Sequence, residues 1–201
     1  MEATPHIAIL ILAAGQSTRM KEHIKQLLPL QKSTLIGKAI EEATASNAKK
    51  VFVVLGAFQE EITENIGLSP DDIIYNPNWE QGMGSSLAAG INHIRSSTTS
   101  IRGVLVMLAD QPLIDATYLN QLIREWLKDS SKIVTTKYAK RSGVPALFGA
   151  PYFDNLSQLD KDFGAKHLIE QHSNFIMSVD AKGRELDLDD YQTYQSFIKT
   201  N

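Results

Sequence analysis

The stretch Ile7-Ala8-Ile9-Leu10-Ile11-Leu12-Ala13-Ala14-Gly15 decides the fold class. A run of consecutive apolar residues, with no alternation of polar side chains, is typical of a strand that is buried on both faces. The small residues that follow end the strand in a turn, since Gly15 can adopt backbone angles that other residues avoid. Strands of this kind occur in sheets with helices above and below them. The stretch therefore predicts an α/β protein with a mainly parallel sheet.

The rest of the chain alternates between strand-like and helix-like patterns. Further strands are predicted at Val51–Leu55, Ile73–Tyr75, Gly103–Leu108, Ile133–Thr136, Val144–Phe148 and Phe175–Val179. Helices are predicted from Ser33 or Thr34 to about Ser46, at Gln59–Ile66, at Ser85–Arg95, after a cap at Asp115, and over about 164–171 and 189–199. From its residue pattern alone, Val144–Phe148 is expected to be an edge strand of the sheet. The alternation predicts a three-layer α/β/α sandwich, as a single domain over residues 1–201.

Composition excludes several function classes. The 201 residues include no cysteine, which excludes disulfides, thiolate metal sites and cysteine nucleophiles. The net charge is −3 and no dense Lys/Arg stripe occurs, so nucleic acid is not an expected partner. The first residues lack the basic region of a signal peptide, and no run approaches the roughly 20 apolar residues needed to cross a bilayer. We therefore expect a cytoplasmic protein with no membrane partner.

The loop from Leu12 to Lys25 has the composition of an anion-binding turn. Small residues at positions 13 to 15 allow backbone N–H groups to approach an anion, and Arg19 and Lys25 add positive charge suited to phosphates. The loop matches neither the Gly-rich phosphate loop of ATPases and kinases nor the dinucleotide-binding fingerprint. By composition alone, an ordinary turn and a phosphate-binding turn are equally well supported.

A carboxylate follows the strand predicted at Gly103–Leu108. Asp110 begins the tripeptide Asp110-Gln111-Pro112, and magnesium prefers such hard oxygen ligands together with substrate phosphates. The alternative is that Asp110 caps the next helix, but Asp115 already fits that position. Because ligands in such sheets bind beyond the carboxyl ends of strands, Asp110 and the first loop are expected to lie close together.

The first loop resembles a known family. The pattern L-A-A-G-x-S-x-R-M, with Lys25 six residues after Arg19, resembles nucleotidyltransferases with a glycosyltransferase-A-like fold, and among these the enzymes of the molybdenum cofactor. The resemblance implies a nucleotide-diphospho-sugar-transferase-like fold. It also implies that this loop wraps a nucleoside triphosphate, with Arg19 and Lys25 on the phosphates. The nucleotide-binding loop residues are then Leu12, Ala13, Ala14, Gly15, Arg19 and Lys25.

Two details of this loop distinguish branches of the family. Ala13-Ala14 resembles the cytidylyltransferase branch, whereas the guanylyltransferase branch more often has Ala-Gly. CTP is therefore favoured, and GTP stays open. The family usually has glycine after the Arg-Met pair, where this chain has Lys21. That departure concerns the shape of the local backbone and leaves the phosphate ligands in place.

The resemblance extends along most of the chain and implies roles for further residues. It makes Asp110 the ligand of Mg²⁺, with Asp187 and Asp189 as candidates for a second carboxylate. An alternative is that Asp189 or Asp190 only caps the last helix. Segment 76–87, which resembles the family's E-G-x-x-x-S-L motif, adds the nucleotide-binding candidates Asn76, Gly82 and Ser86. Two further motifs, resembling G-x-P-x-x-F and G-D-x-G-A-R, imply the acceptor-side residues Gly143, Pro145, Asp162 and Lys166.

The reaction implied is transfer of a nucleoside monophosphate from CTP or GTP to a phosphate-bearing acceptor, with release of pyrophosphate. Arg19, Lys25 and Asp110 are the expected catalytic residues. The molybdopterin form of the molybdenum cofactor is the expected acceptor, and a molybdoenzyme or its chaperone is a candidate partner. Two alternatives stay open: a cytidylyltransferase or sugar-phosphate nucleotidyltransferase with a different acceptor, and a non-catalytic nucleotide-binding accessory protein for molybdoenzyme maturation.

Overall fold

A seven-stranded sheet forms the centre of the computed structural model, which describes residues 6–97, 100–138, 141–159 and 164–200. In chain order the strands are β1 (His6–Leu12), β4 (Lys50–Leu55), β5 (Ile73–Tyr75), β6 (Ile101–Leu108), β7 (Ile133–Lys137), β8 (Ser142–Gly149) and β9 (Ile176–Asp180). In space their order is β5-β4-β1-β6-β8-β7-β9. Only β8 runs antiparallel to its neighbours in this sheet. The predicted α/β class with a mainly parallel sheet is confirmed.

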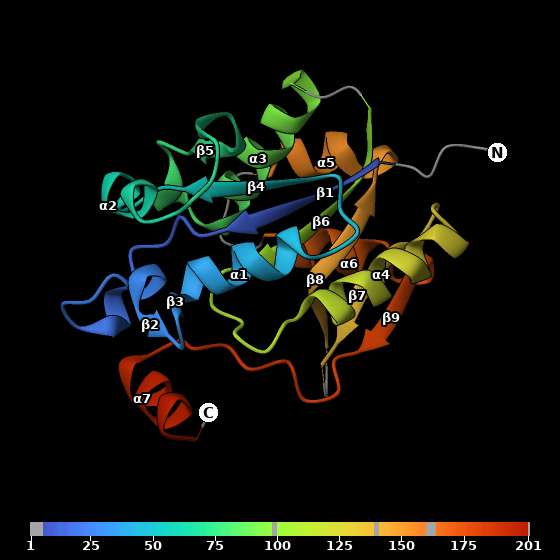
Figure 1. Cartoon of the computed structure of the whole chain (residues 1–201). Coiled ribbons are helices and arrows are strands. Elements are labelled where there is room, and N and C mark those ends of the chain that lie inside the picture. The colour runs from blue at the N-terminus through green and yellow to red at the C-terminus, as the bar shows by residue number, and fades with distance from the viewer. Residues whose placement is uncertain (1–5, 98–99, 139–140, 160–163, 201) are drawn as a thin grey trace.

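Helices cover both faces of the sheet, as Figure 1 shows. One face carries α1 (Leu35–Thr44), α2 (Gln59–Glu64) and α4 (Ala116–Lys128). The other carries α3 (Met83–Ser97), α5 (Phe153–Ser157) and α6 (Lys166–Gln171). The side chains of β1 alternate between the two layers: Ile7, Ile9 and Ile11 pack on one side, and Ala8, Leu10 and Leu12 on the other. Both faces of this strand are buried, which explains its uninterrupted apolar sequence.

The predicted helix starts on the first face match the structure. The Thr34 side chain accepts a hydrogen bond from the Gly37 amide and begins α1. The Asp115 side chain accepts one from the Tyr118 amide and begins α4. Each cap satisfies an N–H that the first helical turn leaves without a partner. Asp115 therefore holds the capping role that was one alternative for Asp110.

The expectation that Val144–Phe148 forms an edge strand is wrong. β8 lies inside the sheet, between β6 and β7. Proline is disfavoured in inner strands because it cannot donate to the ladder, except at irregularities. Pro145 sits at such a place, since the pairing of β7 with β8 shifts register between Thr135 and Thr136. The Pro145 carbonyl accepts a hydrogen bond from Thr136 Oγ1 at 2.8 Å. This side-chain bond gives the carbonyl a partner at the place where the pairing of the two strands is irregular.

A third apolar cluster lies outside the sheet and fastens the C-terminal helix. This helix, α7 (Tyr191–Thr200), packs near the hairpin of β2 (Pro29–Leu30) and β3 (Ser33–Thr34), below the sheet in Figure 1. The cluster consists of Met20, Leu28, Leu30, Leu35, Leu188, Tyr194 and Phe197. The Tyr194 hydroxyl also donates to the Pro29 carbonyl at 2.8 Å. The segment that carries Asp187 and Asp189 is thereby held beside the first loop.

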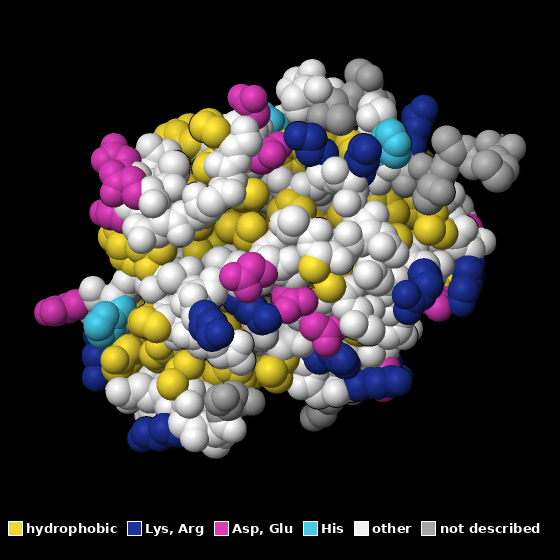
Figure 2. Space-filling model, viewed as in Figure 1, with side chains coloured by type: hydrophobic (Ala, Val, Ile, Leu, Met, Phe, Trp, Pro, Cys, Tyr) yellow, Lys and Arg dark blue, Asp and Glu magenta, His cyan; other side chains and the backbone are white. Residues whose placement is uncertain are grey.

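None of the helices in the described ranges is long and apolar enough to cross a membrane. Basic and acidic side chains are mixed over the face in Figure 2, and among the side chains coloured there no continuous basic band crosses it.

Candidate active site

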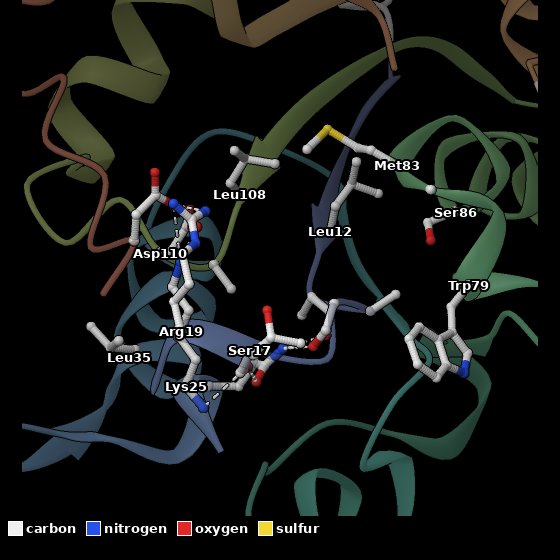
Figure 3. A pocket seen from close by; sticks show the side chains of 18 residues that line it. Leu12, Ser17, Arg19, Lys25, Leu35, Trp79, Met83, Ser86, Leu108 and Asp110 are labelled. Carbon is white, nitrogen blue, oxygen red and sulfur yellow. Dashed lines mark hydrogen bonds and ion pairs between the residues drawn. The ribbon is translucent and has the colours of Figure 1, made fainter. Parts of the chain in front are cut away.

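A pocket of about 420 Å³ opens beyond the carboxyl ends of β1 and β6. The two strands are hydrogen-bonded neighbours, so the loops that follow them meet. The pocket is lined by Leu12, Ala13, Ala14, Gly15, Ser17, Thr18, Arg19, Lys25, Gln26, Leu35, Trp79, Gly82, Met83, Ser86, Leu108, Ala109, Asp110 and Asp189. In Figure 3 the charged residues Arg19, Lys25 and Asp110 lie on one side and Trp79 and Ser86 on the other. The fold thus brings together most of the predicted nucleotide-binding residues.

The shape of the first loop depends on Gln26, which the sequence did not single out. Its side chain is buried and donates to the carbonyls of Ala13 and Gly15 at 2.9 and 3.0 Å. It also accepts a hydrogen bond from the Ser17 hydroxyl. A buried amide that ties two backbone carbonyls fixes the loop around it. In the sequence Gln26 lies between Lys25 and an apolar run, a position that gives no sign of burial.

Lys21 adopts a backbone conformation that suits glycine. Its φ and ψ are 57° and −125°, and a side chain at such angles is strained. Lys21 therefore adopts the backbone shape expected of the glycine that the family usually has at this position. The Lys21 ammonium lies 5.3 Å from the centre of the Tyr191 ring, which partly offsets the strain.

The positive charges of the loop are paired with carboxylates in the described structure. Lys25 Nζ lies 2.5 Å from Asp110 Oδ2 and 3.6 Å from Asp189 Oδ1. Arg19 lies 3.7 Å from Asp189. The side chains of Lys25 and Asp110 are mostly buried, whereas those of Arg19 and Asp189 are more than half exposed. The two predicted catalytic groups, which come from two separate loops, are thus in direct contact, and the exposed pair lies at the pocket mouth.

Asp110 has the free oxygen that a cation site requires. Its Oδ1 is buried and, among the described residues, has no hydrogen-bond partner. An unpaired buried carboxylate oxygen is unfavourable unless a cation or a donor completes it. No group of three or more His, Asp or Glu side chains in the described residues is arranged to hold a metal. Magnesium often takes only one or two carboxylates and completes its shell with substrate phosphates, so the arrangement fits Mg²⁺ with a triphosphate.

The three C-terminal aspartates have different surroundings. Asp190 caps α7, because its side chain accepts from the Thr193 amide and hydroxyl. Asp189 lines the pocket and faces Arg19 and Lys25. Asp187 lies deeper, and burial raises the pKa of its carboxyl, with the charges of Asp110 and Asp189 adding to the rise. The helix-cap alternative thus applies to Asp190, and Asp187 and Asp189 keep their places beside Asp110.

A neutral wall faces the charged side of the pocket. Trp79 begins a short 3₁₀ turn (Trp79–Gln81), and Gly82 follows it with a φ of 104°, a conformation that favours glycine. Ser86 lies in the first turn of α3 and lines the pocket. Asn76 does not line it; this side chain is buried and donates to the Ser85 and Ser86 hydroxyls at 2.9 and 3.0 Å. The structure thus places Asn76 behind the wall, where it orients Ser86.

Three of the predicted acceptor-side residues, Gly143, Pro145 and Lys166, do not line the pocket. Gly143 lies next to the Tyr138 ring, since a Cβ added there would be 3.1 Å from it. Lys166 is exposed at the start of α6 and lies 3.8 Å from Glu170. A Cβ added at Gly164 would lie 3.2 Å from the sulfur of Met83, which lines the pocket, so this segment lies near the pocket rim. Pro145 lies within β8, and Asp162 falls outside the described residues.

A search against protein-family models matches residues 9–175 to the MobA-like NTP transferase domain. The chain belongs to this family. The match covers the first loop, Lys25, Asp110 and the neutral wall, and ends before Asp187. The C-terminal carboxylates therefore have to be assigned from the geometry.

Curated relatives carry names from different reaction classes. The chain is 33% identical over 119 residues to nicotine blue oxidoreductase of Paenarthrobacter nicotinovorans, covering 59% of this chain and 56% of the relative. It is 32% identical over 122 residues to the bifunctional protein GlmU of Clavibacter sepedonicus, covering 60% of this chain and 24% of the relative. The chain thus aligns with about half and about a quarter of these proteins, and their names do not fix its reaction.

Solved structures resemble the chain over nearly its whole length. Rv0371c of Mycobacterium tuberculosis H37Rv superimposes with a TM-score of 0.83 at 24% identity, covering 98% of this chain and 99% of the other. The same protein in complex with manganese has a TM-score of 0.78 at 23% identity, covering 98% and 100%. At these identities the likeness establishes the fold. The manganese belongs to that protein.

Proposed function

We propose that the protein is a nucleotidyltransferase that binds a nucleoside triphosphate with Mg²⁺ in this pocket and transfers the nucleoside monophosphate to a phosphate-bearing acceptor. One observation carries the proposal. Lys25, from the loop that follows β1, lies 2.5 Å from Asp110, just after β6, and Asp110 keeps a buried oxygen without a partner among the described residues. A cation for phosphates and a ligand for a metal thereby lie in contact beside a loop suited to anions.

The chemistry follows from the charges available. A phosphate oxygen of the acceptor attacks the α-phosphorus in line, a new P–O bond forms, and the bond to pyrophosphate breaks. The attacking phosphate monoester is already largely ionised near neutral pH, so no strong base is needed. Lys25 and Arg19 stabilise the negative charge that develops on the phosphates. Magnesium, when bound through Asp110 with either Asp187 or Asp189, neutralises further charge on the triphosphate.

CTP is the proposed substrate, with GTP as the alternative. Ala13 and Ala14 line the pocket, and both are nearly fully buried. The carbonyl of Ala14 accepts a hydrogen bond from the Ala57 amide, so the backbone at this position is tied to the next loop. The methyl group of Ala14 takes up space in the pocket that glycine, the residue of the guanylyltransferase branch, would leave open. A pyrimidine, which is smaller than a purine, fits this arrangement better.

The molybdopterin form of the molybdenum cofactor is the proposed acceptor. The support is the membership in the MobA-like family together with the resemblance of the first loop to the cytidylyltransferases of this cofactor. Such an acceptor carries the phosphate monoester that the chemistry requires. A molybdoenzyme or its chaperone is the proposed protein partner. Methylerythritol phosphate and sugar phosphates are the alternative acceptors, because they present the same nucleophile.

The test measures pyrophosphate release with each of the four triphosphates, Mg²⁺ and each candidate acceptor. We expect release with CTP and molybdopterin. We expect Lys25→Met and Asp110→Asn to reduce turnover by about 100-fold or more, as loss of a key electrostatic group does. Lys132→Met and Asp129→Asn are matched controls on the surface and should keep wild-type turnover. Near-normal turnover in both site variants would refute the assignment.

A non-catalytic nucleotide-binding accessory protein is the second candidate. The same protein and substrates distinguish it from a nucleotidyltransferase. Triphosphate binding is measured by thermal shift with Mg²⁺. Binding without pyrophosphate release for any acceptor favours the accessory role. The contact between Lys25 and Asp110 argues against it, because a passive binder needs no metal ligand next to the phosphate cation. Selectivity between CTP and GTP is read from the same shifts.

A further inference from the structure

Gln111 is the residue next to Asp110, and its side chain is buried with only 4% exposed. Its amide nitrogen donates two hydrogen bonds of 2.9 Å, to Asp187 Oδ1 and to the Tyr138 hydroxyl. Its amide oxygen is buried and has no partner among the described residues. Leaving a buried acceptor unpaired costs stability. The side chain is therefore poorly placed for stability alone but well placed to hold two groups at once.

Tyr138 continues the connection toward the acceptor side. Its hydroxyl donates to the Val144 carbonyl, and burial raises the pKa of this hydroxyl to about 12, so it stays protonated and can donate. Val144 lies between the two predicted acceptor-side residues of β8, Gly143 and Pro145. Hydrogen bonds thus run without a break from the Asp187 carboxylate through Gln111 and Tyr138 to β8. We name these four residues the Asp187–Val144 chain.

Asp187 needs the donor that Gln111 supplies. Its carboxyl is partly buried and faces two further aspartates, Asp110 and Asp189. Asp189 differs, because it is about half exposed and lies within 4 Å of both Arg19 and Lys25. The backbone after Asp187 is also held, since the Leu188 amide donates to the Asp110 carbonyl at 3.0 Å. The orientation of the Asp187 carboxylate therefore depends on the Gln111 amide.

We propose that Gln111 is a positioning residue for the nucleotidyl transfer: it holds Asp187 beside Asp110 and links this carboxylate through Tyr138 to the β8 segment that borders the acceptor. The inference rests on the proposed function. Gln111 would thereby couple the position of the metal-binding carboxylates to the position of the acceptor-side segment. Residues that orient ligands in this way affect metal affinity or activity by about 10-fold to 100-fold when they are replaced.

The test uses the full chain with three variants and one control. Gln111→Met removes the amide and keeps the length of the side chain. Gln111→Glu keeps its shape but cannot donate to Asp187. Tyr138→Phe cuts the Asp187–Val144 chain on the acceptor side only. Gln195→Met, on the exposed side of α7, is the matched control. The measurements are Mn²⁺ affinity with CTP present, by electron paramagnetic resonance, and kcat and KM with molybdopterin.

We expect Gln111→Met to weaken Mn²⁺ binding and raise the KM for molybdopterin, each by about 10-fold. Gln111→Glu should raise this KM as well, but its added negative charge beside the site should keep Mn²⁺ binding from weakening. Tyr138→Phe should raise that KM while leaving Mn²⁺ affinity within about twofold of wild type, because the bond from Gln111 to Asp187 remains. CTP affinity without metal should stay as in wild type in all variants. A small fall in melting temperature is expected in the Gln111 and Tyr138 variants, because each leaves a buried hydrogen-bonding group without its partner. This split between the two sides is what a purely structural role would not produce.

Wild-type Mn²⁺ affinity and KM in Gln111→Met would overturn the inference. So would a parallel loss of CTP affinity and melting temperature, because it would show that Gln111 only supports the fold. If the wild type releases no pyrophosphate, the proposed function fails, and the Mn²⁺ measurement still decides the role of Gln111. The two failures are therefore distinguishable.

Discussion

The two oxygens of Asp110 have different roles in the ligand-free arrangement. Oδ2 contacts Lys25 Nζ, and Oδ1 is buried without a partner among the described residues. A positive charge 2.5 Å from one oxygen repels a divalent cation that approaches the other. A triphosphate offers Lys25 a stronger competing anion. Metal binding is then expected to depend on the nucleotide, which draws the ammonium away from the carboxylate.

Replacing Lys25 tests this dependence on the nucleotide. Lys25→Met should raise the affinity for Mn²⁺ in the absence of nucleotide by about 10-fold, because the repelling charge is gone. Electron paramagnetic resonance of free and bound Mn²⁺ gives the affinity. Lys128→Met, whose ammonium pairs with Glu125 on α4, is the control and should bind Mn²⁺ as the wild type does. Equal affinity in the wild type and Lys25→Met would contradict the expected competition.

The strained backbone at Lys21 predicts a stabilising substitution. A non-glycine residue at a φ of 57° and ψ of −125° costs about 1–3 kcal/mol, and an exposed cation–π contact returns about 0.5–1 kcal/mol. Lys21→Gly should therefore stabilise the protein by about 1 kcal/mol, which is roughly 2–4 °C in melting temperature. Calorimetry measures this. Lys21→Met keeps the strain and loses the charge, so it should be slightly less stable than wild type.

At the scale of elements, the sheet and its capped helices could be predicted from periodicity, because buried strands and amphipathic helices leave regular patterns. The inner position of β8 could not, since register irregularities leave no such pattern. The charged residues of the candidate site could be predicted from their positions after strands and from the family resemblance. Gln26 and Gln111 could not, because the hydrogen bonds of a buried glutamine join segments that are far apart in the sequence.

The end of β4 sets the position of the neutral wall. A Cβ added at Gly56 would lie 2.4 Å from Trp79 Cβ and 2.8 Å from the Ala14 carbonyl oxygen. Gly56→Ala must therefore shift the wall or the first loop, and overpacking of this kind costs about 1–3 kcal/mol. We expect lower stability in urea unfolding and weaker CTP binding. Gly67→Ala, where nothing lies within 4 Å, is the control for the loss of a glycine.

At the scale of the whole molecule, three apolar clusters hold different parts of the structure together. Two of them hold helices to the faces of the sheet. The third joins the loop and hairpin after β1 to α7 and to Leu188, which lies between Asp187 and Asp189 in the sequence. Segments from opposite ends of the described chain thus complete one site. The family model, which matches residues 9–175, ends before this closing segment.

Deleting α7 should disturb the site while leaving the sheet folded. Removal of residues 191–200 uncovers Met20, Leu30 and Leu35 but leaves both sheet clusters intact. We expect cooperative unfolding to persist, with faster amide exchange confined to the first loop and hairpin and with CTP affinity reduced about 10-fold or more. Hydrogen-exchange mass spectrometry maps the first effect. Unchanged exchange between residues 17 and 35 would show that α7 does not hold the loop.

The hydrogen bond from the Leu188 amide to the Asp110 carbonyl has a consequence for biosynthesis. A ribosome makes the strands that form the sheet before it makes residues 187–197, and domains fold as their residues emerge. The growing chain can therefore begin to assemble its sheet before the carboxylates and the helix that complete the site have emerged. The nascent protein has a fold before it has a finished pocket, and it gains binding competence only with this later segment.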